Sequence, residues 1–143
     1  MKCTFLSAIF AVVAFTSNAQ LDNAKLQQEF VKELNAYRIS KGLNTVSLNS
    51  ADIKTAQNQA IYCVSVNKLT HYYPDFKNVE AECALFNGNL PTAKTSLNQW
   101  INSINHNKLL LLPDVTTIGI YYIKGFSNEF NISGYYAVLV LNL

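Results

Sequence analysis

The sequence predicts an α+β domain whose helices precede its strands. Three stretches between residues 22 and 105 place apolar residues three and four positions apart, which is the spacing of one helix face. Residues 116–143 are instead rich in Ile, Val and Tyr, and the alternation of Ile118, Ile120 and Tyr122 is typical of a β-strand. The chain lacks the strand–helix alternation of a parallel α/β sheet and contains no internal repeat.

The first helix is predicted over Asp22–Ser40. Asp22 or Asn23 can cap its first turn with a side-chain oxygen, and Gly42 can end it in the left-handed conformation. Its apolar stripe consists of Leu26, Phe30, Leu34 and Tyr37.

A second helix is predicted to begin at Asn49 or Ser50, either of which can cap it, and to run to about Asn67. Cys63 lies on this helix, beside the inner residues Ile53, Ala56, Ala60, Ile61 and Val64. The periodicity then fades, so Lys68–Asn89 is expected to be irregular chain with a short helical turn over Glu80–Phe86.

The third helix is predicted over Thr92–Asn105, directly after Pro91, with Leu97, Trp100, Ile101 and Ile104 on one side. Trp100 is expected to be core packing rather than a ligand platform. Two strands follow, over Thr116–Ile123 and Gly134–Leu143, and Lys124–Ser133 is long enough to join them as an antiparallel hairpin.

Residues 1–19 have the three-part organisation of a cleavable signal peptide, with Lys2, the apolar run Phe5–Phe15 and the ending Ser17-Asn18-Ala19. The apolar run is too short to span a bilayer, which takes about 20 residues, and no later stretch is long enough either. Residues 20–143 are therefore expected to form one exported domain without a transmembrane segment, secreted and extracellular, or periplasmic in a bacterium.

Charge excludes a nucleic-acid partner. Once Lys2 leaves with the leader, ten of the 11 Lys and Arg residues remain against nine Asp and Glu residues. The basic residues form no run, and Arg38 is the only arginine, whereas nucleic-acid backbones are bound by clustered Lys and Arg.

Cys63 and Cys83 are the two cysteines that remain after the leader is removed. In an oxidising compartment they are predicted to form a disulfide, which would close a loop of about twenty residues and stabilise the domain by ~3 kcal/mol. A thiol nucleophile or a metal-binding pair is the alternative.

The two histidines, His71 and His106, lie at the ends of predicted elements rather than inside an apolar stripe. An imidazole can act near neutral pH as a general base, a proton shuttle or a metal ligand. Carboxylates close to His71 in the sequence are Asp75, Glu80 and Glu82.

Seven strings taken in order resemble the CAP superfamily, whose SCP domains occur in cysteine-rich secretory proteins, antigen 5 and pathogenesis-related 1 proteins. The resemblance covers essentially all of residues 24–143. The strings are Leu34-Asn35-Ala36-Tyr37-Arg38 with Gly42-Leu43, the alanine-bearing second helix, Leu69-Thr70-His71, Ala81-Glu82-Cys83-Ala84, Trp100-Ile101-Asn102-Ser103 with His106-Asn107, Thr116-Thr117-Ile118-Gly119-Ile120, and Tyr135-Tyr136-Ala137-Val138.

The resemblance implies an α-β-α sandwich with a small antiparallel sheet and a shallow cleft of two histidines and two acids that binds zinc in some members. His71, His106 and Glu82 match three of these positions and are the candidate metal ligands. Ser103 replaces the second acid, and Cys83 replaces the usual Asn, so the site lacks one ligand or orienting partner.

Two functions follow from these residues. The first is a non-enzymatic extracellular binding module for a small apolar ligand such as a lipid, for a carbohydrate or for a protein, with Tyr72, Tyr73, Phe76 and Phe86 available to line a pocket. The alternative is a hydrolase in which His71 or His106 acts as general base, Glu82 orients it and Ser103 is the nucleophile. Asn131-Ile132-Ser133 is also an N-glycosylation sequon.

Overall fold

The structure is a computed structural model that describes residues 21–71 and 81–143. The predicted signal peptide at residues 1–19 lies outside this range, as do Tyr72, Tyr73, Asp75, Phe76 and Glu80. Four helices and four strands follow one another along the described chain: α1 (Asn23–Ser40), β1 (Ser47–Leu48), α2 (Ser50–Ser65), β2 (Ala81–Asn87), α3 (Ala93–Ile101), α4 (Ile104–Leu110), β3 (Thr117–Ser127) and β4 (Ile132–Asn142).

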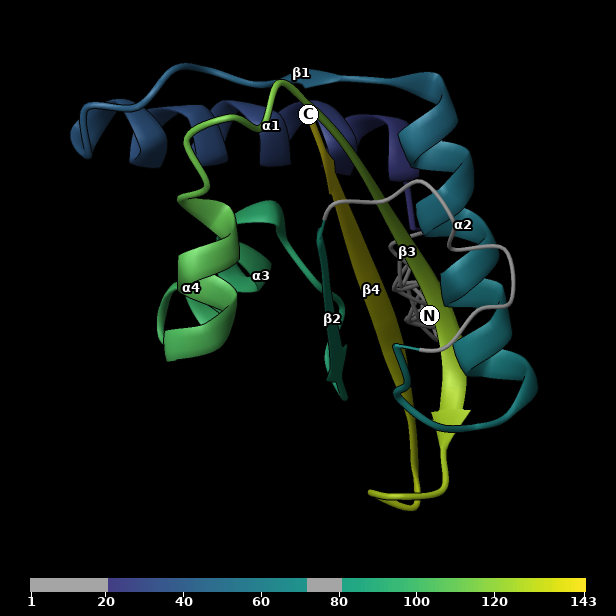
Figure 1. The fold of residues 1–143 in the computed structure, drawn as a ribbon. Coiled ribbons are helices and arrows are strands. Elements are labelled where there is room, and N and C mark those ends of the chain that lie inside the picture. The colour runs from purple at the N-terminus through teal and green to yellow at the C-terminus, as the bar shows by residue number, and fades with distance from the viewer. Residues whose placement is uncertain (1–20, 72–80) are drawn as a thin grey trace, which may run out of the picture.

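The strands form one sheet in the order β1-β3-β4-β2. The three long strands pair with one another in antiparallel orientation, whereas the two-residue strand β1 runs parallel to β3. The sheet is therefore mixed rather than purely antiparallel, and β4, the last strand in sequence, lies between β2 and β3 (Figure 1).

Helices cover both faces of the sheet, so the expected α+β sandwich is confirmed. Helix α2 packs on one face, where Ala56 and Ala60 meet Ala84, Val138 and Val140. The other helices pack on the opposite face, where the larger core contains Phe30, Leu34, Leu97, Trp100, Leu110, Ile118, Ile120, Tyr122, Leu139 and Leu141. Among the described residues, no helix is long and apolar enough to cross a membrane.

Capping explains where the two long helices begin. Asp22 caps α1 by accepting a hydrogen bond from the Lys25 backbone, and Asn49 caps α2 by accepting from Ala51 and Asp52. Gly42, with φ +75°, follows the end of α1 in the left-handed conformation. The first two predicted helices are confirmed within two residues at each end.

The third predicted helix is divided in two. Asn102 and Ser103 separate α3 from α4, and Ile104, which was placed on the inner stripe with Trp100, is 76% exposed. Trp100 itself is 1% exposed and meets Phe30 edge-to-face, with ring centroids 5.6 Å apart. Its prediction as core packing is confirmed.

The helical turn predicted at Glu80–Phe86 is wrong, because residues Ala81–Asn87 form strand β2 instead. Ala, Glu and Leu favour helices locally, but pairing with β4 over seven residues satisfies the backbone and overrides that preference. The predicted hairpin is confirmed and is longer than expected, because the β3–β4 ladder extends to Ser127 and Ile132 and leaves only four residues for the turn.

The predicted disulfide between Cys63 and Cys83 is not formed, and both residues are buried free thiols. Strand alternation explains why. Cys83 points into the core on the α1 face, whereas its neighbour Ala84 points toward α2, the helix that carries Cys63. The two side chains thus lie on opposite faces of the sheet, and a disulfide needs Cβ atoms about 4 Å apart.

We expect residues 20–143 to carry two reduced cysteines. Burial raises the pKa of the Cys63 thiol and raises that of Cys83 to about 12, so both thiols should react with iodoacetamide slowly in the folded protein and fully after unfolding. Mass spectrometry of protein unfolded and alkylated without reductant checks this. A chain that takes up no label would show that the two cysteines are bonded.

Candidate functional site

Three separate elements supply the predicted site residues. His71 follows the turn after α2, Glu82 is the second residue of β2, and His106 lies in the first turn of α4. Glu82 points to the α2 side of the sheet because it alternates with Cys83 on the strand. We refer to His71, Glu82 and His106 as the histidine–glutamate cluster.

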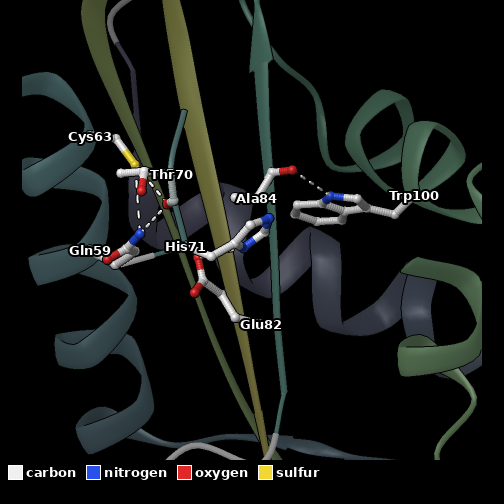
Figure 2. Close-up of polar contacts among 7 residues, drawn as sticks. All are labelled: Gln59, Cys63, Thr70, His71, Glu82, Ala84 and Trp100. Atoms are coloured by element: carbon white, nitrogen blue, oxygen red, sulfur yellow. Dashed lines mark hydrogen bonds and ion pairs between the residues drawn. The ribbon is translucent and has the colours of Figure 1, made fainter. Parts of the chain in front are cut away.

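His71 and Glu82 face each other across 3.6 Å, measured from Nδ1 to Oε1 (Figure 2). The two side chains differ sharply in exposure, at 62% for His71 and 8% for Glu82. Oε1 of Glu82 is buried and accepts no hydrogen bond from the described residues. Burial raises the pKa of Glu82 to about 7, so its carboxyl group exchanges a proton near neutral pH.

His106 contacts Ser103, with 2.9 Å between Nδ1 and Oγ. Ser103 is the N-cap of α4 and His106 is three residues further on, so the two side chains meet over the first turn. Burial lowers the pKa of His106, and the electrostatic effect of His71 lowers it further. Both effects favour the neutral form of the His106 imidazole.

The cluster is brought together only in part. Glu82 contacts His71, and His106 interacts with His71 electrostatically, but no hydrogen bond or ion pair among the described residues joins Glu82 to His106. In residues 21–71 and 81–143, no group of three or more His, Cys, Asp or Glu side chains is arranged to hold a metal ion. The zinc site of His71, Glu82 and His106 that the family resemblance implies stays a prediction.

A buried polar group lies beside the cluster. Gln59 of α2 donates through Nε2 to the Thr70 carbonyl, and the Cys63 thiol lies 3.4 Å from the same oxygen (Figure 2). These contacts fix the chain immediately before His71. Gln59 is not among the residues predicted for the site, although it is the one amide on the buried stripe of Ala56, Ala60 and Cys63.

Strand β2 is held from its other side by Trp100. The indole Nε1 donates to the Ala84 carbonyl at 3.5 Å, two residues after Glu82 (Figure 2). Phe86, a predicted pocket residue, lies four residues beyond Glu82, where it contacts Phe130 and Tyr136.

Glu82 should make the stability of the domain depend on pH. Between its ordinary pKa of 4.5 and about 7, the unfolded chain has released this proton and the folded chain retains it. The free energy of unfolding should therefore fall as pH rises through this window, by at most about 3 kcal/mol, and level off above it.

Urea unfolding of the wild type and Glu82→Gln at pH 5 and pH 8 measures this contribution. We expect the difference between the two proteins to change over that interval in favour of Glu82→Gln at pH 8. If the two proteins differ in free energy of unfolding by the same amount at pH 5 and pH 8, Glu82 is ionised at both pH values.

The family of the chain is given by comparison with known proteins. Residues 31–141 match the model of the CAP family, described as the cysteine-rich secretory protein family. No curated protein matches the sequence.

Solved structures share the fold. An outer surface protein from Borrelia burgdorferi has a TM-score of 0.65 at 19% identity, with 85% of this chain and 96% of that chain covered. MpPR-1i has a TM-score of 0.68 at 11% identity, with 85% and 90% covered. An extracellular SCP-domain protein from Bacillus anthracis has a TM-score of 0.62 at 15% identity, with 85% of this chain and 41% of that chain covered.

The chain thus spans nearly all of the Borrelia protein and about two fifths of the Bacillus protein. The matched residues include Glu82 of β2, His106 of α4 and the whole of β3. On the family match and the shared fold, the chain belongs to the CAP family.

Proposed function

We propose that this CAP domain is exported and acts as an extracellular binding module that takes a carbohydrate at the histidine–glutamate cluster. Export rests on the leader-like residues 1–19 and on relatives whose names describe outer-surface, extracellular or secretory proteins. The observation that carries the ligand class is the buried Oε1 of Glu82, which lacks a donor among the described residues.

A buried acceptor without a donor costs free energy, so it favours a ligand that supplies an N–H or O–H group. Sugars present several hydroxyl groups that can both donate and accept. One hydroxyl can donate to Glu82 while the exposed His71 imidazole contacts the next, because these two side chains lie 3.6 Å apart.

The described residues offer a small apolar ligand a different place. A cavity of about 240 Å³ lies between the first half of α1 and the segment before α3, and its apolar lining is Leu21, Leu26, Leu90 and Pro91. None of its lining residues belongs to the histidine–glutamate cluster. Variants of the cluster therefore distinguish carbohydrate binding from lipid binding in this cavity.

A glycan array probed with residues 20–143 tests the proposal, followed by calorimetry with the best glycan. Glu82→Ala and His71→Ala should each weaken binding about tenfold, because each removes one hydrogen-bonding group. Glu129→Ala, which removes an exposed glutamate from the β3–β4 turn, is the matched control and should bind normally. An array without signal, or equal affinities for wild type and His71→Ala, would contradict the proposal.

The hydrolase is the second candidate, favoured by the 2.9 Å contact between Ser103 Oγ and the imidazole of His106. A neutral His106 can accept the serine proton. However, the acid expected to orient this base contacts His71 instead. We expect p-nitrophenyl acetate to be hydrolysed at the same rate by the wild type and Ser103→Ala, and a loss of a hundredfold or more would favour the enzyme.

A further inference from the structure

Helix α4 is too short to hold its own position. It contains seven residues, and isolated helices of this length are unstable in water. Its N-cap Ser103 makes no hydrogen bond to the helix backbone, because the hydroxyl group contacts His106 instead. The placement of His106 must therefore come from contacts between α4 and its surroundings.

Arg38 of α1 holds the end of α4. Its side chain is fully buried, and Nη1 donates to the carbonyls of Leu110 at 2.7 Å and Leu112 at 3.0 Å. Leu110 is the last residue of α4, where helix carbonyls lack backbone donors and the helix dipole is negative.

Arg38 has no carboxylate partner among the described residues, and its Nε donates to the Asn44 carbonyl at 2.9 Å. In the part of the chain that the structure describes, only carbonyl groups accept hydrogen bonds from this buried cation. Moving the end of α4 would leave it uncompensated, at a cost larger than that of losing a neutral hydrogen bond.

Tyr37, the preceding residue of α1, holds the middle of α4. Its hydroxyl donates to Oδ1 of Asn107 at 2.8 Å, and its ring packs partly buried against the main core. Asn107 directly follows His106 in the sequence. Two neighbouring residues of α1 thus hold the middle and the end of α4.

We infer that Tyr37 and Arg38 are positioning residues that set the place of His106 relative to His71 and Glu82. The consequence for ligand binding rests on the proposed function. The placement of α4 by Tyr37 and Arg38 does not depend on it. Two residues of the string Leu34-Asn35-Ala36-Tyr37-Arg38 thereby gain a role in the cluster, although they lie on another helix.

The test is NMR spectroscopy of residues 20–143 with Tyr37→Phe and Arg38→Lys at pH 8. In both variants, residual dipolar couplings of Ile104–Leu110 should no longer fit the wild-type orientation, while those of β3 and β4 should. Side-chain resonances of His106 should shift as well. Amide exchange in α4 should accelerate about tenfold in Arg38→Lys, because one ammonium group cannot replace the forked guanidinium.

Tyr121→Phe is the matched control, because it removes a hydroxyl that contacts Gln57 on the α2 side of the molecule. It should leave α4 unchanged. If Tyr37→Phe folds and keeps wild-type couplings in α4 and wild-type resonances for His106, the inference is wrong. These readouts need no ligand, so a negative glycan array would contradict the proposed function and leave this inference standing.

Discussion

Replacing Gly119 by alanine should destabilise the domain by at least about 3 kcal/mol, because the added methyl group has no room. A Cβ atom at this position would lie 2.0 Å from the Asp52 carbonyl carbon and 2.1 Å from the Ile53 nitrogen. Both are backbone atoms in the first turn of α2, so neither can move aside as a side chain would. The whole helix would have to lift from the sheet.

Urea unfolding of Gly119→Ala measures this loss, and Gly42→Ala provides the control. Gly42 has φ +75° but open space around its Cα, so its substitution brings backbone strain of about 1 kcal/mol without a clash. The expected order is wild type, Gly42→Ala and then Gly119→Ala. Equal stability of the two variants would mean that α2 does not pack this closely on β3.

Trp100→Ala should cost about 3–5 kcal/mol, the range for removing a fully buried large aromatic side chain. Trp100 fills the core between α1 and the sheet, where its ring meets Phe30. The substitution also removes the indole donor to the Ala84 carbonyl. Because that carbonyl belongs to β2, the loss should also loosen the strand that carries Glu82.

Thermal and urea unfolding of Trp100→Ala, with Ile104→Ala as control, test this expectation. Ile104 is 76% exposed, so its truncation should change the free energy of unfolding by no more than about 0.5 kcal/mol. Both residues belong to the same predicted apolar stripe. A similar loss of unfolding free energy in the two variants would mean that Ile104 is buried like Trp100, on one helix that continues through Asn102 and Ser103.

Local sequence patterns predicted those helices and strands whose spacing, caps and composition all favour the same secondary structure. The first two helices have helical periodicity and polar caps, the first also has a Gly stop, and the last two strands are rich in β-branched and aromatic residues. Strand β2 could not be recognised, because its residues Ala81–Asn87 become a strand only when β4 is beside them. The break before α4 was missed because Ile104 continues the helical spacing on a face that points to solvent.

The family resemblance predicted more of the candidate site than residue spacing did. His71 and His106 are 35 residues apart, and no local rule pairs either of them with Glu82. The disulfide prediction failed because compartment and cysteine number carry no information about which face of a strand Cys83 occupies. The buried Gln59 could have been noticed, because a polar residue on an otherwise apolar stripe requires a partner.

The central position of β4 has a consequence for how the protein is made. Strands β2 and β3 have no common neighbour until Ile132–Asn142 have left the ribosome, so the nascent chain cannot complete its sheet before this strand is available. The polypeptide should remain unfolded until translation of this strand is finished. Such late folding would suit the export proposed above, because only an unfolded chain can be threaded through a translocation pore.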